Sequence, residues 1–225
     1  MRVVGVVFLF ITCLVYADNS SPVVLESPNV SIYNSKAIAN GANFFAKNCL
    51  ACHSMKLLRH DKVANDAGIT LDNMPNIAST AWSMRPPPDL SVIARVRSTN
   101  WLYTYLHSFY VDESVALGSN NLLMHNTSMP NVFLALQGRQ VLQLARNKWS
   151  GTEHYYQLLH LDLRGELTPH QFDMDIKDLV TFLLYAADPH AVEREYLGIK
   201  VVLFVVLLAF FAILLTKSYW RLIKK

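Results

Sequence analysis

The sequence predicts a mainly α-helical domain that carries one C-terminal transmembrane helix. Apolar residues recur every three or four positions over residues 36–48 and 169–187, which is the spacing of one face of an α-helix. A longer apolar stretch near the C-terminus is sufficient to cross a bilayer. Alternating apolar and polar residues are hard to find, so little strand is expected. With 225 residues, the chain has room for one globular domain of ordinary size and its membrane segments.

Residues 1–17 have the pattern of a secretory signal peptide. Arg2 supplies a positive n-region, a short apolar run follows, and Ala17 ends a small-residue cleavage site. An uncleaved anchor is less favoured, because the run is shorter than a bilayer span. Cleavage would remove Cys13 and release an exported domain over residues 18–196 that has two cysteines.

The first helix is expected over Lys36–Asn48, with Asn34 and Ser35 as capping residues. It leads into a C-x-x-C-H motif at Cys49-Leu50-Ala51-Cys52-His53, which is the attachment signature of a c-type haem. Two thiols one helical turn apart can each add across a vinyl group of the porphyrin, and the adjacent imidazole can bind the iron as proximal ligand. The three Cys and eight His of the chain would give about 0.001 such matches by chance.

Two other uses of paired cysteines fit less well. A redox dithiol normally opens a helix in a βαβ unit, and no strand-rich segment flanks Cys49 and Cys52. A zinc site would need a second pair of ligands, and the exported domain has no further cysteine. The other seven histidines show no mutual ligand spacing, so one covalently attached haem c and no second metal are expected.

The middle of the chain is expected to consist of loops and short helices. Residues 63–88 form a long irregular segment, and such loops are usually functional. Asp89 is a candidate cap for a helix through Arg97, and Asn100 for another across Trp101–Tyr110. Residues 118–131 are again irregular, a short helical stretch follows through Gln137, and residues 138–168 give mixed signals.

The clearest helix begins at Thr168-Pro169, a cap residue followed by proline at the first helical position, and ends at Asp188-Pro189. A helix that leads into C-x-x-C-H and a late amphipathic helix, joined by loops, are typical of a class I cytochrome c-like haem domain with long loop insertions. The apolar stripe of this late helix is formed by Phe172, Ile176, Leu179, Leu183 and Ala186.

The transmembrane helix is expected over Leu197–Trp220. Val201–Leu215 is a run of fifteen residues without a charge, and Lys200 can extend from the entry end towards the interface. The short tail, residues 221–225, is basic, so the positive-inside rule puts it in the cytoplasm and the haem domain on the periplasmic side of a bacterial inner membrane. A buried core helix would not be so apolar all round.

The charge of the exported part differs from that of the whole chain. The formal net charge is +3, yet residues 18–199 hold 14 Lys and Arg against 17 Asp and Glu. Residues 162–195 hold eight acids and three bases. An acidic exported face suits a basic protein partner and argues against nucleic acid.

A second axial ligand to the iron is expected to be methionine or histidine. Met55 is two residues from His53 and therefore lies on the same side of the iron. Met174 lies roughly 200° around its helix from Phe172, away from the apolar stripe. Met129 sits in an irregular segment whose backbone is fixed by the following proline, and it is the favoured candidate. The remaining candidates are Met74, Met84, Met124 and His125.

Several motifs occur together in one order along the chain: Cys49-Leu50-Ala51-Cys52-His53-Ser54-Met55, Pro87-Pro88-Asp89-Leu90-Ser91 with Arg95 and Arg97, Ser128-Met129-Pro130, Phe182-Leu183, and Ala186-Ala187-Asp188-Pro189. In these motifs and in its tail anchor, the chain resembles the cytochrome c1 family. These proteins are haem subunits of the respiratory quinol:cytochrome c oxidoreductase, the cytochrome bc1 complex. The resemblance covers essentially the whole exported chain.

The resemblance implies a role in electron transport. The haem would accept one electron at a time from the Rieske iron–sulfur protein and pass it to a cytochrome c, while quinol is oxidised on cytochrome b in a dimeric multi-subunit complex. Met129 matches the methionine ligand of the family. Arg95 and, less clearly, Arg97 suit the haem propionates, because guanidinium groups bind carboxylates bidentately. Pro88 is expected to pack beside the haem by shape.

The chain departs from the family pattern at Leu57-Leu58-Arg59-His60, where the family often has aromatic and arginine residues, so haem-edge contacts are not carried over there. The acidic insertion of some members is also absent. Two alternatives stay open. One is a membrane-anchored monohaem cytochrome c of a terminal oxidase, which would share the haem motif but not the proline-aspartate-leucine-serine segment. The other is a haem-based gas sensor with an open sixth site.

Overall fold

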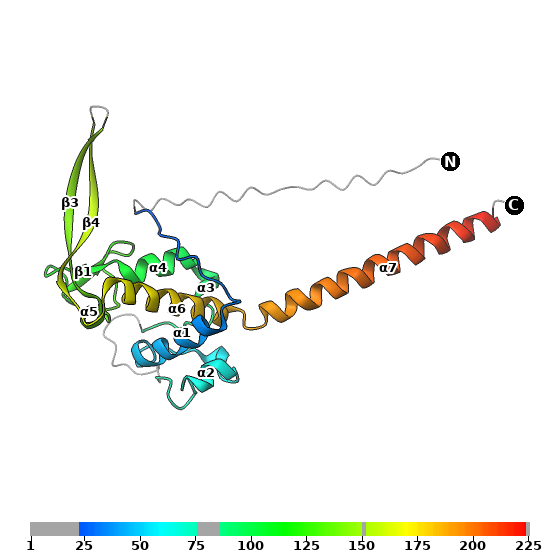
Figure 1. Ribbon diagram of the computed structural model, residues 1–225, viewed down its shortest axis with the longest axis horizontal. Coiled ribbons are helices and arrows are strands. Elements are labelled where there is room, and N and C mark those ends of the chain that lie inside the picture. Colours follow the sequence, from blue (N-terminus) through cyan, green and yellow to red (C-terminus); the bar gives the residue numbers. More distant parts are fainter. Residues whose placement is uncertain (1–22, 76–85, 150–151, 224–225) are drawn as a thin grey trace.

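The computed structural model describes residues 23–75, 86–149 and 152–223. The expected signal peptide and the candidate ligand Met84 lie outside these ranges. Figure 1 shows a domain of helices, loops and two small sheets, from which one long helix leads away. Within the described residues, the mostly helical architecture and one C-terminal helix apolar enough to span a membrane confirm the expected fold class.

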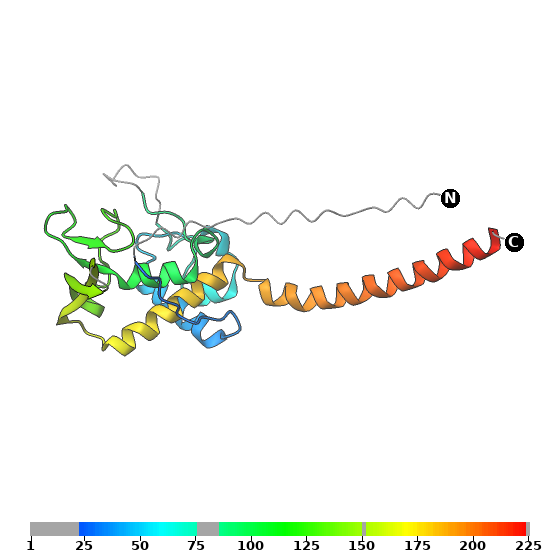
Figure 2. The ribbon, with the colours of Figure 1, turned by 90° about the horizontal axis from the view of Figure 1, so that it is seen from above.

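Two helices at the centre of the domain, α1 (Ser35–Asn48) and α6 (Pro169–Ala187), lie side by side (Figures 1 and 2). Both begin as predicted. The side chain of Asn34 caps α1, and that of Thr168 caps α6 in a capping box with Gln171. Each cap satisfies backbone N–H groups that the first turn of a helix leaves without an intrahelical partner.

The contact between α1 and α6 is unusually close at Gly41. A Cβ atom at this position would lie 2.0 Å from the carbonyl oxygen of Asp178 and 2.8 Å from Cβ of Phe182. Next to it, the rings of Phe45 and Phe182 pack with centroids 5.8 Å apart. The predicted apolar stripe of α6 is buried in this interface and around it: Phe172, Ile176, Leu179, Leu183 and Ala186.

Helix α4 (Thr99–His107) packs on α6 as well, so that α6 lies between α1 and α4 in Figure 1. The prediction of a helix over Trp101–Tyr110 with Asn100 as cap was wrong at both ends. Ser98 is the cap, since its side chain accepts the backbone N–H of Trp101, and the chain turns into a strand after Ser108.

The helix expected from Asp89 to Arg97 is only the four-residue α3 (Ile93–Val96). Asp89 does not cap it, because the carboxylate of Asp89 binds the segment after the haem motif instead. The other short helices are the 3₁₀ turn η1 (Lys56–Leu58), α2 (Lys62–Asp66) and α5 (Leu134–Gln137).

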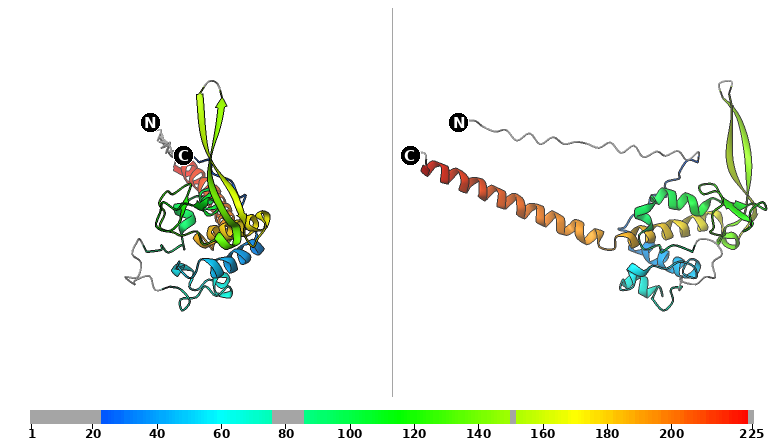
Figure 3. Two further views of the ribbon diagram at one scale, coloured as in Figure 1. Left: turned by 90° about the vertical axis from the view of Figure 1, so that its left-hand side faces the viewer. Right: turned by 180° about the vertical axis from the view of Figure 1, so that it is seen from behind.

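Two antiparallel pairs of strands occur where little strand was expected. β1 (Phe109–Val111) pairs with β2 (Ser119–Asn121), and β3 (Gly138–Trp149) pairs with β4 (Thr152–Arg164). The β3–β4 hairpin projects from the domain, as Figures 1 and 3 show. The sequence signals over residues 138–168 were mixed, because the alternation of apolar and polar residues that marks a half-buried strand is weak there.

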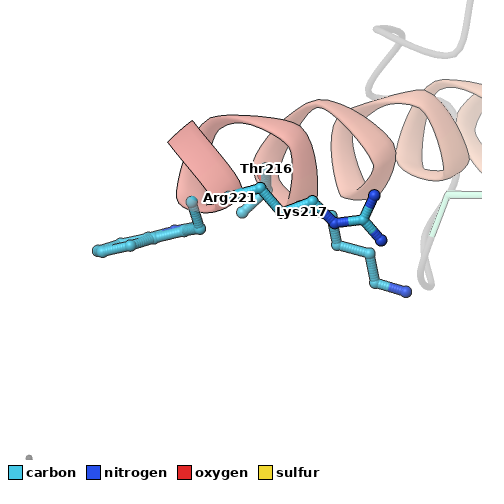
Figure 4. Close-up of a pocket in the computed structure, with 4 residues that line it drawn as sticks. Thr216, Lys217 and Arg221 are labelled. Carbon is cyan, nitrogen blue, oxygen red and sulfur yellow. The ribbon is translucent and has the colours of Figure 1, made fainter. Parts of the chain in front are cut away.

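Helix α7 (Ala191–Ile223) is long and apolar enough to cross a membrane: within the candidate span Ala191–Arg221, an 18-residue window has a mean hydropathy of 2.9. It begins six residues before the predicted Leu197, and these first turns contain Glu193, Arg194 and Glu195. The far end is basic. A shallow groove there is lined by Thr216, Lys217, Trp220 and Arg221, as Figure 4 shows.

Candidate haem site

One turn of the chain at the end of α1 carries both cysteines and the histidine of the motif. The backbone N–H of Cys49 donates to the carbonyl of Phe45 at 2.8 Å, which continues the helical pattern into the motif. The carbonyl of Cys49 then accepts the N–H groups of Cys52 at 3.1 Å and His53 at 2.9 Å. Both cysteines are free thiols. The amphipathic helix therefore delivers all three groups to one place.

The imidazole of His53 is oriented by a backbone carbonyl. Its Nδ1 lies 2.9 Å from the carbonyl oxygen of Pro88. A carbonyl can only accept, so Nδ1 carries the proton and Nε2 has the lone pair that a metal requires. Burial lowers the pKa of His53, although the Pro88 carbonyl and Asp89 raise it in part. The ring is thereby kept in the neutral form that binds iron.

The thiol of Cys49 lies at the border of the apolar core. Burial, with a smaller effect from Cys52, raises the pKa of Cys49 to about 12, so the group is protonated at neutral pH. Addition to a vinyl group requires a reduced thiol that is not already in a disulfide. The set of donors on this turn, two free thiols and an imidazole with an available Nε2, fits a haem c.

Asp89 fastens the segment after the motif to the segment that contains Pro88. Its Oδ2 accepts the hydroxyl of Ser54 at 2.7 Å and the backbone N–H of Lys56 at 2.9 Å, while Oδ1 accepts the N–H of Ser91 at 2.9 Å. In addition, the N–H of Leu90 donates to the carbonyl of Ser54 at 2.9 Å. These bonds fix the position of the Pro88 carbonyl relative to the imidazole.

Met129 lies in the loop after β2, half-buried against the same apolar core that Cys49 and Leu90 border. Its backbone N–H lies 3.4 Å from Oγ1 of Thr127. The assignment of Met129 as axial ligand stays a prediction. Met174 is half exposed on α6, as the helical spacing predicted.

The two arginines of the predicted propionate set have protein partners. Nε of Arg95 donates to the carbonyl of Ala187 at 2.8 Å, and Nη2 pairs with Asp188 at 2.8 Å, at the C-terminal end of α6. The guanidinium of Arg97 lies over the ring of Trp101, 4.7 Å from its centroid. Arg95 therefore joins α3 to α6, and its contact with a propionate stays a prediction.

Comparison with known proteins identifies the family. The Cytochrome C1 family matches residues 72–223, which include Pro88, Arg95 and Met129. The chain belongs to the cytochrome c1 family. A cytochrome c1 of Allochromatium vinosum is 34% identical over 216 residues, which cover 88% of this chain and 88% of the relative. An ammonia monooxygenase gamma subunit of Nitrosomonas europaea is 33% identical over 242 residues, covering 98% of this chain and 99% of the relative.

Membership in the cytochrome c1 family confirms the resemblance found in the sequence motifs. It identifies an electron-transfer protein that carries haem c and functions as a haem subunit of a bc1 complex together with cytochrome b and the Rieske protein. The apolar helix α7 fits a membrane-anchored member of this family.

A group of buried polar residues beside Met129 was not predicted from the sequence. Asn120 and Asn121 are both buried on β2, and Thr127 is buried in the loop that follows. The one signal in the sequence is an Asn-Asn pair a few residues before the methionine, in a segment that shows no helical or strand period. What each amide bonds depends on tertiary contacts, so the pattern alone did not single these residues out.

Asp89→Asn is expected to destabilise the domain at neutral pH and less so in acid. Burial raises the pKa of Asp89, but hydrogen bonds from Lys56, Ser91 and Ser54 outweigh it, and the net pKa falls below its ordinary value of 3.8. The stabilising effect of the carboxylate is therefore present above pH 3.8 and is lost as the pH falls through the lower folded value. Urea unfolding of the variant and of the unmodified protein at pH 7 and pH 3 measures this contribution to stability.

The control for this variant is Asp66→Asn, which removes the carboxylate of an exposed pair with Lys62 and should change stability little at either pH. Equal destabilisation by Asp89→Asn at both pH values would contradict the role assigned to the charge of Asp89.

Proposed function

We propose that this chain relays one electron at a time from a Rieske iron–sulfur protein to a cytochrome c, through one haem that is covalently attached at Cys49 and Cys52. The observation that carries the proposal is the hydrogen bond of 2.9 Å between Nδ1 of His53 and the carbonyl of Pro88, beside two free thiols. This bond leaves Nε2 as the proximal ligand. A bound c-type haem supplies a one-electron iron couple.

Met129 is proposed as the second axial ligand. It is half-buried at the edge of the core next to a polar loop, and it occupies the position of the ligand motif in the family. Three of the alternatives fit less well. Met55 is fully buried two residues after His53, and Met124 and Met174 are exposed to 37% and 50%. Methionine ligation and an apolar surrounding both raise the reduction potential, which suits an acceptor of electrons from a Rieske centre.

The domain is proposed to lie on the periplasmic side of a bacterial inner membrane, with residues 18–196 exported, 197–220 spanning and 221–225 in the cytoplasm. Lys217 and Arg221, at the far end of α7, support this orientation (Figure 4). The polar first turns of α7 are then the part of the helix next to the exported domain.

We propose protein partners for both the donation and the acceptance of electrons. The excess of acids over bases in residues 162–195 suits a basic cytochrome c as the acceptor. Within a dimeric complex, the chain is proposed to contact cytochrome b through its anchor. Quinol chemistry takes place on that partner, so the residues of this chain hold and orient the redox centre and make no substrate bonds.

The haem is expected to be covalently attached through both cysteines. Protein denatured and extracted with acid should keep one haem per chain, because thioether bonds survive the loss of the fold. Cys49→Ser and Cys52→Ser should each leave a single bond and a lower yield of holoprotein, measured by a haem stain after denaturing electrophoresis. Release of all haem from the unmodified protein would refute covalent attachment.

Met129→Leu should remove the sulfur ligand while the volume of the side chain stays similar. The expected result is loss of the sulfur-to-iron charge-transfer band, binding of carbon monoxide to the reduced protein, and a midpoint potential lower by more than about 100 mV. Since about 59 mV is a tenfold change in a one-electron equilibrium, such a fall would stop turnover with a Rieske donor. Spectra and redox titration of the purified protein provide these measurements.

The matched control is Met174→Leu, which makes the same substitution at a half-exposed position on α6 and should leave the spectrum unchanged. A normal spectrum for Met129→Leu together with an altered one for Met174→Leu would place the ligand on α6 instead.

A second candidate comes from the Nitrosomonas relative, which matches this chain over nearly its whole length and is named as a subunit of an ammonia monooxygenase. Purification of the tagged full chain in mild detergent, followed by identification of the co-purifying subunits, separates the two assignments. We expect cytochrome b and a Rieske protein. Recovery of monooxygenase subunits in their place would support the second candidate and overturn the relay.

A further inference from the structure

The loop that holds Met129, residues 122–130, is fastened by side chains buried beneath it. We refer to these residues as the ligand loop. It leaves β2 after Asn121 and returns at Asn131, where the backbone N–H donates to the hydroxyl of Ser119 at 3.2 Å and closes the base. The Tyr105 ring, from α4, lies under the loop and is buried.

The start of the ligand loop is held by Asn121, which is fully buried. Its Oδ1 accepts the N–H groups of Leu123 at 2.9 Å and Met124 at 3.3 Å, and its Nδ2 donates to the carbonyl of Tyr105 at 2.8 Å. The neighbouring Asn120 accepts the N–H of Asn126 at 2.8 Å. The bonds to Leu123, Met124 and Asn126 join the loop to β2, and the bond to the Tyr105 carbonyl joins β2 to α4.

The end of the ligand loop is held by Thr127. Its side chain is buried, and its Oγ1 is hydrogen-bonded to the Tyr105 hydroxyl at 3.0 Å. The same oxygen lies 3.4 Å from the backbone nitrogen of Met129, whose N–H donates to it. The Thr127 hydroxyl is thus the link between helix α4 and the backbone of Met129.

Tyr105 is itself held in place from two sides. Its ring stacks on Trp101 with centroids 4.9 Å apart and meets the edge of Phe109 at 5.2 Å. A phenol fixed in this way presents its hydroxyl at one position without further loss of side-chain freedom. The position of Thr127, and through it that of Met129, is therefore set by the rigid part of the domain.

We propose that Thr127 and Tyr105 form a positioning pair for the axial ligand, because their hydrogen bonds hold the Met129 backbone in the place from which its sulfur would bind the iron. The inference rests on the proposed function, because it takes Met129 as the ligand. The sulfur–iron bond is weak enough for other ligands to compete with it, and the hydrogen bonds of Thr127 oppose the movement of the loop that would let them in.

Thr127→Val tests this pair, because valine keeps the shape of threonine and removes the hydroxyl. The oxidised full-length protein in detergent is titrated with imidazole, which takes the place of the methionine sulfur. The apparent affinity for imidazole should rise about fivefold, the factor that one buried hydrogen bond is typically worth. Thr127→Ser keeps the hydroxyl and should bind imidazole like the unmodified protein.

The matched control is Thr181→Val. Thr181 is also buried, and its Oγ1 donates to the carbonyl of Lys177 at 2.8 Å within α6. This variant loses one buried hydrogen bond and should lower the thermal unfolding midpoint much as Thr127→Val does, yet leave the affinity for imidazole unchanged. If a general loss of stability were the cause of the higher affinity for imidazole, both variants would show the same increase.

The outcomes distinguish a failure of Met129 as the ligand from a failure of the positioning pair. If the unmodified protein binds imidazole as readily as Met129→Leu does, Met129 is not the ligand and the proposed ligation fails. A second result is that Met129→Leu binds imidazole far more tightly than the unmodified protein, while Thr127→Val and Thr181→Val have the same affinity for imidazole. In that case Met129 stands as the ligand and the positioning pair is overturned.

Discussion

The close contact of α1 with α6 at Gly41 is the constraint on which the rest of the domain depends. Only a residue without a side chain allows the backbone of α1 to touch the carbonyl of Asp178. The two helices carry the most distant functional parts of the sequence, since α1 ends at the haem motif and α6 leads towards the membrane anchor. The crossing of these two helices therefore determines where the haem motif lies relative to the start of the anchor. The packed rings of Phe45 and Phe182 stabilise this crossing.

The candidate ligands on the two sides of the site are held by similar means. On the proximal side, a backbone carbonyl orients His53, and Asp89 fixes the chain that contributes this carbonyl. On the side of Met129, the hydroxyl oxygen of Thr127 accepts the backbone N–H of this proposed second ligand. In both arrangements the group that directly contacts the candidate ligand is uncharged, a carbonyl for His53 and a hydroxyl for the backbone of Met129, while the carboxylate of Asp89 acts one step further out. Such dipoles hold a position without the desolvation cost of a buried ion.

The sequence predicted what local patterns encode. The caps at Asn34 and Thr168 and the apolar stripe of α6 were all found at the residues named, because each depends on neighbours along the chain. The haem motif was visible for the same reason, since its chemistry lies within five consecutive residues.

The features that were missed depend on partners far away in the sequence. The carboxylate of Asp89 was expected to cap a helix. It instead accepts the backbone N–H of Lys56, which lies 33 residues earlier in the sequence. The amide of Asn121 donates to the carbonyl of Tyr105 across 16 residues. Tertiary contacts of this kind override local propensity and leave little trace in composition or period.

The junction between α6 and α7 has a consequence for how partners meet this protein. Three residues separate the two helices, and the carboxylate of Asp188 there is shared by Arg95 and Arg194, which belong to α3 and α7. With α7 as a membrane anchor, so short a connection would keep the domain close to the lipid surface. Under the proposed function, its carriers would then meet it within a thin layer along the membrane, where a search in two dimensions replaces one in three.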